Sequence, residues 1–299
     1  MQRKSAQMLT SKKGMVITMK IGVSSYSFSK WRKQTGADLT VLCEKAKELG
    51  FDGVEFTAIE ADDPLAKARE LREKCESLGL PIIAHTVGAN LLCDDPDAET
   101  ERLMRCVDVA EALGAPVMRH DVATKLRARD GYTWQDAVEE MAPRIRAVTE
   151  YAAARGIRTC TENHGYLFQN SRRVERLIRT VNSPNYGWLV DLGNFLCVDE
   201  DPKKAVRRAA PYAFHVHAKD FLYVKRKPGV PEPVGFFKTG NGNFLRGTVV
   251  GHGAVPVVEC VGLLTAAGYD GWLSLEFEGM EENLPALTAG LEYLRKVIG

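Results

Sequence analysis

The stretch Y-A-A-A-R-G-I-R-T-C-T-E-N-H, residues 151–164, decides the fold. It starts at the end of a segment with helical spacing, passes through Gly156 and continues as a short apolar run, Ile157–Thr161, that ends on Glu162. A glycine at such a point adopts the left-handed conformation that ends a helix and returns the chain to a sheet. The stretch therefore predicts a helix followed by a buried strand whose carboxyl end presents an acidic side chain.

The same helix–glycine–strand pattern recurs along the chain. Repeated units of this kind require parallel strands joined by right-handed crossovers. Eight short runs are rich in β-branched and aromatic residues, as in strands buried on both faces. The other glycines of the pattern are Gly50, Gly79, Gly114 and Gly268; strands are expected at 21–26, 53–56, 81–86, 116–119, 157–161, 186–190, 213–216 and 272–277, and helices at 40–49, 65–78, 98–113, 134–154, 173–181, 257–267 and 284–298.

Eight strands alternating with helices predict an α/β protein with a single (β/α)₈ barrel, a TIM barrel, over residues 20–299. The rival is an open doubly wound sheet, which normally has a glycine-rich phosphate loop after its first strand. Here the first strand leads into S-S-Y-S-F, residues 24–28, so the barrel is favoured. Residues 1–19 are mixed, basic and polar, and we expect a flexible N-terminal leader there.

A long insertion follows the seventh predicted strand. Residues 221–256 contain four prolines and seven glycines and have no clear helical period. An insertion of this length in a compact domain is usually functional. Phe236, Phe237 and Phe244 suggest a partly apolar lid or hairpin over the barrel mouth, whereas a solvated excursion or an oligomer contact is the alternative.

Composition excludes several classes of partner. The net charge is +1, so there is no basic excess for a nucleic-acid backbone, and no run of about 18 apolar residues predicts a membrane span. The cysteines are odd in number and scattered, which is typical of buried thiols in a reducing cytoplasm. They are Cys43, Cys75, Cys93, Cys106, Cys160, Cys197 and Cys260.

Ionisable residues end four consecutive strands, in the order Glu162, Asp191, His217 and Glu276. The carboxyl ends of barrel strands share one face, where barrel active sites lie. Carboxylates that converge in an apolar funnel persist there only if they are protonated, paired or bound to a cation. Three carboxylates and an imidazole therefore predict a site for one divalent ion, with Mn²⁺, Mg²⁺, Co²⁺ and Zn²⁺ all compatible.

Each of these residues also has a simpler interpretation when taken alone. A glutamate at a strand end is often a salt-bridge partner, Asp191 would also start a turn, and His217 would also serve as a hydrogen-bonded core histidine. His215 shares a face with His217 because side chains alternate along a strand. His85 and His120 either pack in the core or line the pocket.

At these residues the chain resembles the xylose-isomerase-like barrel superfamily of sugar isomerases and epimerases. That superfamily includes ketose 3-epimerases, inosose dehydratases and the endonuclease IV branch. The resemblance covers residues 20–299. It depends on G-V-S-S-Y-S-F (22–28), G-F-D-G-V-E-F (50–56), T-E-N-H (161–164), V-D-L-G-N (190–194), H-V-H-A-K-D (215–220) and G-Y-D-G-W-L-S-L-E-F-E-G (268–279).

The resemblance implies roles for individual residues. The metal ligands of the family fall on the four strand-end residues, and in its epimerases the glutamates at Glu162 and Glu276 are also the acid–base pair. The histidine at His215 lies near substrate in the family, and Lys219 and Asp220 match its K-D pair. Where the epimerases often have a histidine after strand six this chain has Asn194. The arginine expected after strand seven has no clear match, unless Lys219, Lys225 or Arg226 substitutes for it.

The sequence thus predicts a metal-dependent sugar isomerase or epimerase that acts on a ketose or related polyol ketone through an enediolate. One of Glu162 and Glu276 would remove the proton next to the carbonyl and the other would return one. His85, His120, Asn194, His215 and Lys219 are the expected substrate-binding residues.

Other activities remain as alternatives. The first is a dehydratase of the inosose type. A phosphodiesterase of the endonuclease type is disfavoured, because Asn194 and Leu222 stand where two of its ligands are expected, and a non-catalytic sensor on the same fold is the last. The expected partner is a small carbohydrate, with neither nucleic acid nor membrane, and a homo-oligomer is compatible with the sequence.

Overall fold

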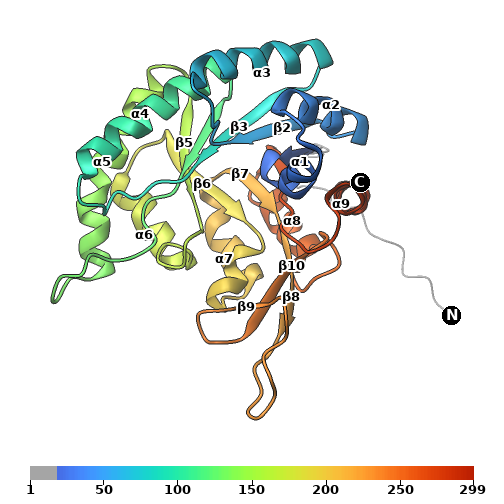
Figure 1. Ribbon diagram of the computed structural model, residues 1–299. Helices are drawn as coiled ribbons and strands as arrows, with labels where there is room; N and C mark the ends of the chain where they lie inside the picture. The colour runs from blue at the N-terminus through green and yellow to red at the C-terminus, as the bar shows by residue number, and fades with distance from the viewer. Residues whose placement is uncertain (1–18) are drawn as a thin grey trace.

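The computed structural model describes residues 19–299. Eight parallel strands close into a barrel in the order β1-β11-β7-β6-β5-β4-β3-β2, and helices surround it (Figure 1). The predicted single-domain barrel is therefore confirmed. Of the predicted leader only Met19 lies within the described residues, and it is buried. The barrel strands are β1 (Lys20–Ser24), β2 (Gly53–Thr57), β3 (Ile82–Val87), β4 (Val117–His120), β5 (Arg158–Glu162), β6 (Tyr186–Asp191), β7 (Ala213–Ala218) and β11 (Trp272–Leu275).

Local sequence signals explain where the helices begin and end. Most begin at an Asp, Asn or Thr whose side chain accepts a backbone N–H of the first turn, as Asp63 does from Ala66. All five predicted glycines have a positive φ, between 58° and 91°. The helices are α1 (Ser29–Thr35), α2 (Leu39–Leu49), α3 (Pro64–Leu78), α4 (Pro96–Leu113), α5 (Trp134–Ala153), α6 (Ser171–Val181), α7 (Pro202–Ala209), α8 (Val257–Ala266) and α9 (Asn283–Ile298), with short 3₁₀ helices η1 (Ser25–Phe28), η2 (Asn194–Val198) and η3 (Ala210–Tyr212).

Two helices were not expected from the sequence. α1 has no buried residue, so it has no apolar face to reveal it. The buried positions of α7, which are Pro202, Ala205, Val206 and Ala209, have helical spacing, but they span only eight residues and three of them are proline or alanine, so the apolar signal is weak. Within residues 19–299 no helix is both long and apolar enough to cross a membrane.

The barrel interior changes from apolar to polar along the strands. Val117, Cys160 and Leu189 form part of a small apolar cluster inside the barrel, separate from the large core between strands and helices. Two residues further along the same strands stand Arg119, Glu162 and Asp191. Because side chains alternate along a strand, these residues share the inward face. The carboxyl end of the barrel is therefore lined with charge above an apolar floor.

The insertion forms a second, antiparallel sheet of β8 (Asp220–Val224), β10 (Phe244–Thr248) and β9 (Phe237–Lys238). A hairpin was one of the two predicted forms. β8 starts two residues after β7 ends, so the sheet projects from the barrel mouth (Figure 1). Phe221 and Leu245 pack on Cys197 of η2, and Asn243 Nδ2 donates to Asp199 Oδ1 at 2.7 Å. Residues 225–235 between β8 and β9 are nearly all exposed.

Candidate metal and active site

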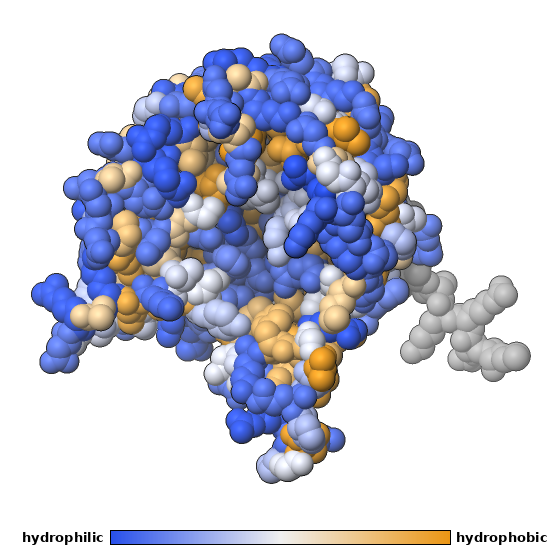
Figure 2. All heavy atoms as spheres, in the orientation of Figure 1, coloured by the Kyte–Doolittle hydropathy of each residue, from blue (hydrophilic) through white to orange (hydrophobic). Residues whose placement is uncertain are grey.

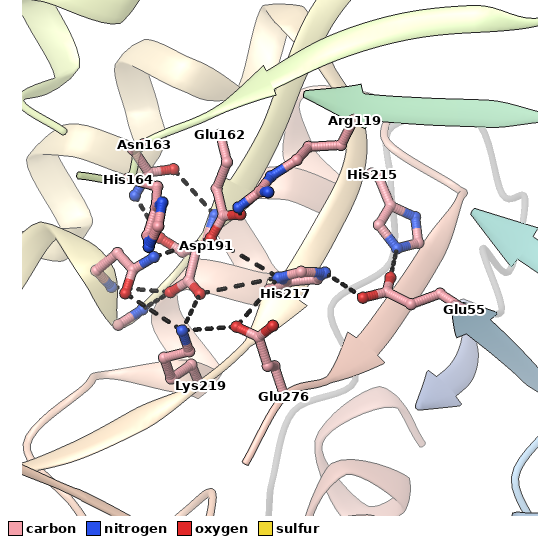
Figure 3. A network of polar contacts seen from close by, with 12 residues as sticks. Glu55, Arg119, Glu162, Asn163, His164, Asp191, His215, His217, Lys219 and Glu276 are labelled. Atoms are coloured by element: carbon pink, nitrogen blue, oxygen red, sulfur yellow. Dashed lines mark hydrogen bonds and ion pairs between the residues drawn. The ribbon is translucent and has the colours of Figure 1, made fainter. Parts of the chain in front are cut away.

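The four predicted ligand residues converge at the carboxyl end of the barrel. Each offers one donor atom, and these atoms all lie within 4.8 Å of one another. His217 Nδ1 is 3.4 Å from Glu276 Oε2, 3.8 Å from Glu162 Oε1 and 3.9 Å from Asp191 Oδ2 (Figure 3). The group lies under a hollow whose floor is mostly hydrophilic (Figure 2).

Unsatisfied atoms of this group face a common centre. Asp191 Oδ1 accepts the backbone N–H groups of Gly193 and Asn194 at 2.7 and 2.8 Å. Among the described residues, neither Asp191 Oδ2 nor His217 Nδ1 has a hydrogen-bond partner. Buried polar atoms without partners are costly, and oxygen and imidazole donors at this spacing suit a divalent cation. The residues therefore fit the metal that the family resemblance implies.

Two cations lie beside the carboxylates. Lys219 Nζ is 2.6 Å from Glu276 Oε2 and 3.4 Å from Asp191 Oδ2. The Arg119 guanidinium forms an ion pair with Glu162 Oε2. Burial opposes the charged form of Lys219, but the carboxylates of Glu276 and Asp191 outweigh it and raise the pKa of Lys219 well above its usual value. In the site, buried positive side chains therefore lie directly beside buried negative ones.

Burial and crowding raise the pKa of Asp191 from its ordinary value of 3.8 to about 7. Burial is the largest cause; Glu162 and Glu276 act in the same direction, and Lys219 partly opposes them. A carboxyl group with this pKa is only partly ionised at neutral pH. An added positive charge at the centre would favour its ionised form.

Two asparagines make hydrogen bonds to the candidate ligands Asp191 and Glu162. Asn163 Nδ2 donates to the Asp191 backbone oxygen at 2.9 Å, and Asn163 Oδ1 accepts from the Asp191 N–H and from the Trp188 indole, both at 3.0 Å. Asn194 Nδ2 donates to Glu162 Oε1 at 2.9 Å. Asn194, expected to bind substrate, is therefore also a neighbour of the ligands.

The remaining predicted substrate-binding residues fall in different places. Lys219 lies within the site, whereas His215 Nε2 contacts Glu55 Oε2 at 2.7 Å beneath it. His85 Nδ1 lies 3.1 Å from the Phe56 backbone oxygen, and its strand partners Phe56 and Met118 belong to the core between strands and helices. The structure therefore brings Lys219 to the ligands and places His85 in a core environment.

His120 occupies a similar environment to His85. Its ring stacks on the buried Tyr186, with ring centroids 6.0 Å apart. Its neighbour Arg119 points the other way, to Glu162. A contact between His120 and substrate stays a prediction.

Sequence reasoning missed Glu55, Arg119, Asp121 and His164. His164 Nδ1 lies 3.1 Å from Asp121 Oδ1, and the His164 side chain is 46% exposed at the mouth. Two signals were available. Glu55 and His164 lie within the quoted motifs, and strand alternation places Arg119, rather than His120, on the face that Val117 shares inside the barrel.

Comparison with known proteins places the chain in a family. Residues 43–297 match the family described as xylose isomerase-like TIM barrel. The 3-oxo-isoapionate decarboxylase of Pectobacterium atrosepticum is 25% identical over 218 residues, which cover 70% of this chain and 71% of that protein. The L-ribulose-5-phosphate 3-epimerase of Escherichia coli is 27% identical over 239 residues, covering 76% and 77%.

Solved structures agree on the fold. The xylose isomerase domain protein from Planctomyces limnophilus superimposes with a TM-score of 0.72 at 20% identity, over 94% of this chain and 97% of that one. The match of the family to most of the chain, together with the closed barrel, settles the assignment. The chain belongs to the xylose isomerase-like TIM barrel family.

Proposed function

We propose that this protein is a divalent-metal-dependent isomerase or epimerase that moves a proton next to the carbonyl group of a ketose or related polyol ketone. The observation that carries the proposal is the convergence of Glu162, Asp191, His217 and Glu276, with unpartnered atoms of Asp191 and His217 facing the same centre. The expected substrate is a small carbohydrate.

The four converging residues would hold the ion, and Lys219 would remain beside it. When bound, a divalent ion supplies Lewis-acid polarisation of a carbonyl oxygen, which favours loss of the adjacent proton. Asn194 orients Glu162 through its hydrogen bond, and Asn163 fixes the end of β6. These contacts hold the carboxylates before substrate arrives.

Glu162 and Glu276 are the groups that would move protons. Glu162 ends β5 and Glu276 follows β11; β6 and β7 lie between these strands, and the two side chains flank the centre from different sides (Figure 3). An epimerase needs one carboxylate to remove the proton and a second group to return a proton on the opposite face of the carbon. Arg119 beside Glu162 and Lys219 beside Glu276 lower the pKa of each carboxyl group, since their charge outweighs the effect of burial.

The two relatives support chemistry of this class. A 3-epimerase of a 2-ketose removes the proton next to the carbonyl, and loss of carbon dioxide from a 3-oxo acid produces the same kind of enolate. The shared requirement is stabilisation of an enolate oxygen.

All seven cysteines are free thiols, which supports our expectation of a reducing, cytoplasmic location.

A lyase is the second candidate, and His164 favours it. Loss of a β-hydroxyl group from an enolate needs an acid that protonates the leaving oxygen. Burial lowers the pKa of His164, but Asp121 and Glu162 outweigh this effect and raise it. The imidazolium form is therefore available at the mouth, where such an acid would be needed.

Solvent exchange tests the proposal. Ketohexoses, ketopentoses, their phosphates and inososes would be incubated with the Mn²⁺-loaded protein in D₂O and followed by NMR and mass spectrometry. We expect deuterium next to the carbonyl of one substrate class, with an epimer or isomer as product. Protein treated with EDTA is the control, and Mn²⁺ should restore the exchange.

Other outcomes separate the candidates. Loss of water would support the dehydratase, and loss of carbon dioxide from a 3-oxo acid would support a decarboxylase. Exchange that persists at full rate in EDTA would contradict the metal requirement. Protein that takes up no divalent ion at all would overturn the proposed site.

A further inference from the structure

Glu55 lies beneath the candidate metal site, on the side away from its three carboxylates. Its side chain is fully buried on β2 and contacts two histidines of β7. Glu55 Oε1 is 2.8 Å from His217 Nε2, and Glu55 Oε2 is 2.7 Å from His215 Nε2 (Figure 3). No role for Glu55 follows from the proton transfer proposed above.

His217 connects Glu55 to the site. Its Nδ1 faces Glu162, Asp191 and Glu276 at 3.4 to 3.9 Å, while its Nε2 faces Glu55. A neutral imidazole that gives the lone pair of one nitrogen to a metal carries its proton on the other nitrogen. Glu55 Oε1 lies 2.8 Å from Nε2, close enough to receive that proton after a small rotation of the ring, although the present angle does not make a hydrogen bond. A carboxylate in this place fixes both the tautomer and the orientation of a ligand histidine.

We propose that Glu55 is a positioning residue of the metal site, which holds His217 with Nδ1 directed at the ion, and that His215 in turn fixes Glu55. The inference depends on the proposed function only in requiring that the site binds a divalent ion. It assigns His215 a supporting place beneath the site in addition to its predicted contact with substrate.

A second ion held by Glu55, His215 and His217 is the rival interpretation, because these three residues also form a compact donor group. The measured separations favour direct contacts. The donors of one tetrahedral ion with bonds of about 2.0–2.2 Å lie roughly 3.3 Å or more apart, whereas Glu55 is 2.7 and 2.8 Å from the two ring nitrogens.

The substitution Glu55→Gln tests the inference with little change of volume. A glutamine has one acceptor oxygen, so it accepts from one of the two histidines and turns its own N–H groups toward the other. We expect the Mn²⁺ dissociation constant to rise about 10–100-fold, the usual effect of losing an outer carboxylate partner. His215→Phe, which removes the second contact of Glu55, should weaken Mn²⁺ binding in the same direction by a smaller factor.

Asp220→Asn is the matched control. Asp220 is also a buried carboxylate, but it accepts backbone N–H groups of Phe221, Gly251, Gly253 and Val255. This variant should lose stability and keep the Mn²⁺ dissociation constant within about twofold of wild type. The comparison separates a specific effect on His217 from a general loss of a buried charge.

Two readouts that need no substrate decide the matter. Electron paramagnetic resonance of free Mn²⁺ gives the affinity and stoichiometry, and long-range ¹H–¹⁵N NMR of the Mg²⁺-loaded protein gives the tautomer of His217, assigned with His217→Gln. We expect one ion per chain and the Nε2–H tautomer in wild type, with that tautomer no longer fixed in Glu55→Gln.

Several outcomes would overturn the inference. One is a folded Glu55→Gln protein with wild-type Mn²⁺ affinity. Another is two ions in wild type and one in Glu55→Gln, which would make Glu55 itself a ligand. If Glu55→Gln does not fold, His215→Phe decides, and unchanged affinity there contradicts the proposal. A wild-type protein that binds no ion would instead remove the proposed function.

Discussion

Lys219 Nζ lies 2.6 Å from Glu276 Oε2, so an ammonium group occupies the edge of the carboxylate cluster. Both side chains are largely buried, at 6% and 12% exposure. Removing one member of a buried pair leaves an uncompensated charge and typically costs about 3–5 kcal/mol. Lys219→Met should therefore lower the free energy of unfolding by about 3 kcal/mol when measured in EDTA.

The same variant should recover much of this loss when Mn²⁺ is added, because the ion replaces part of the missing positive charge. Denaturant unfolding with and without Mn²⁺ measures the difference. Lys238→Met is the control, since the Lys238–Glu232 pair is exposed and such pairs contribute roughly 0–1 kcal/mol. An equal loss in both variants, insensitive to Mn²⁺, would argue against the charge balance described here.

Glu162 and Glu276 should both be required for proton transfer. Replacement of either by glutamine removes a base while keeping the shape of the side chain, and we expect a fall of at least about 10²–10⁴-fold in the rate of deuterium exchange. Since each is also a candidate ligand, the rates must be compared at saturating Mn²⁺. A Glu276→Gln protein that binds Mn²⁺ and exchanges at the wild-type rate would exclude Glu276 from the chemistry.

The barrel could be predicted because its signals are local and repeated. Each glycine that was expected to end a helix lies within three residues of a helix end, and each of the eight barrel strands lies where the apolar runs predicted it. α7 escaped prediction because its helical face is short. The strands of the outer sheet were harder to predict. A long exposed segment separates β8 from its partner β10, and the sequence on either side of this segment shows no clear period.

The convergence of the four strand-end residues could be predicted because the strand ends of a parallel barrel must meet. The motif at 50–56 contains Glu55, but the partners of Glu55 could not be predicted, since its contacts with His215 and His217 join residues 160 or more positions apart in sequence. His85 and Arg119 show that residue type alone is a poor guide to a site residue. Residue type favoured His85, but the alternation of side chains along each strand decides which of them point into the barrel, and it places Arg119 there.

His85 should make stability depend on pH. Burial lowers the pKa of His85 to about 4 from an ordinary value of 6.5. Between these two values the unfolded chain binds more protons than the folded protein, so this contribution to stability rises with pH and is lost as pH falls from 6.5 toward 4. At about 1.4 kcal/mol for each pH unit, the loss is at most about 3.5 kcal/mol.

The variant His85→Asn tests this, because asparagine keeps a donor for the Phe56 backbone oxygen and does not titrate. Urea unfolding at several pH values gives the free energy of unfolding as a function of pH. Between pH 6.5 and 4 this free energy should fall less steeply in the variant than in wild type. The same dependence on pH in both proteins would contradict the conclusion that His85 is buried and neutral in the folded protein. A large rise in the KM of His85→Asn would favour the sequence prediction that this residue contacts substrate.

Asp220 should anchor the outer sheet to the barrel. Its carboxylate accepts four backbone N–H groups at 2.9 to 3.0 Å, three of them from the loop between β10 and α8. Asp220→Ala leaves these buried donors without a partner and should cost at least about 1–3 kcal/mol in the free energy of unfolding. Hydrogen exchange should speed up in residues 249–256 first. Uniformly faster exchange across the barrel would contradict this local role.

The single residue Lys219 separates β7 from β8, so the strand that carries His217 continues directly into the outer sheet. An engineer who wishes to change which molecule enters the mouth cannot exchange the whole sheet without displacing that lysine. Residues 239–243 are tied to Asp199 and Cys197, which leaves the exposed segment 225–235 as the part that is free to be redesigned. Libraries confined to that segment would vary the entrance and leave the charged centre unaltered.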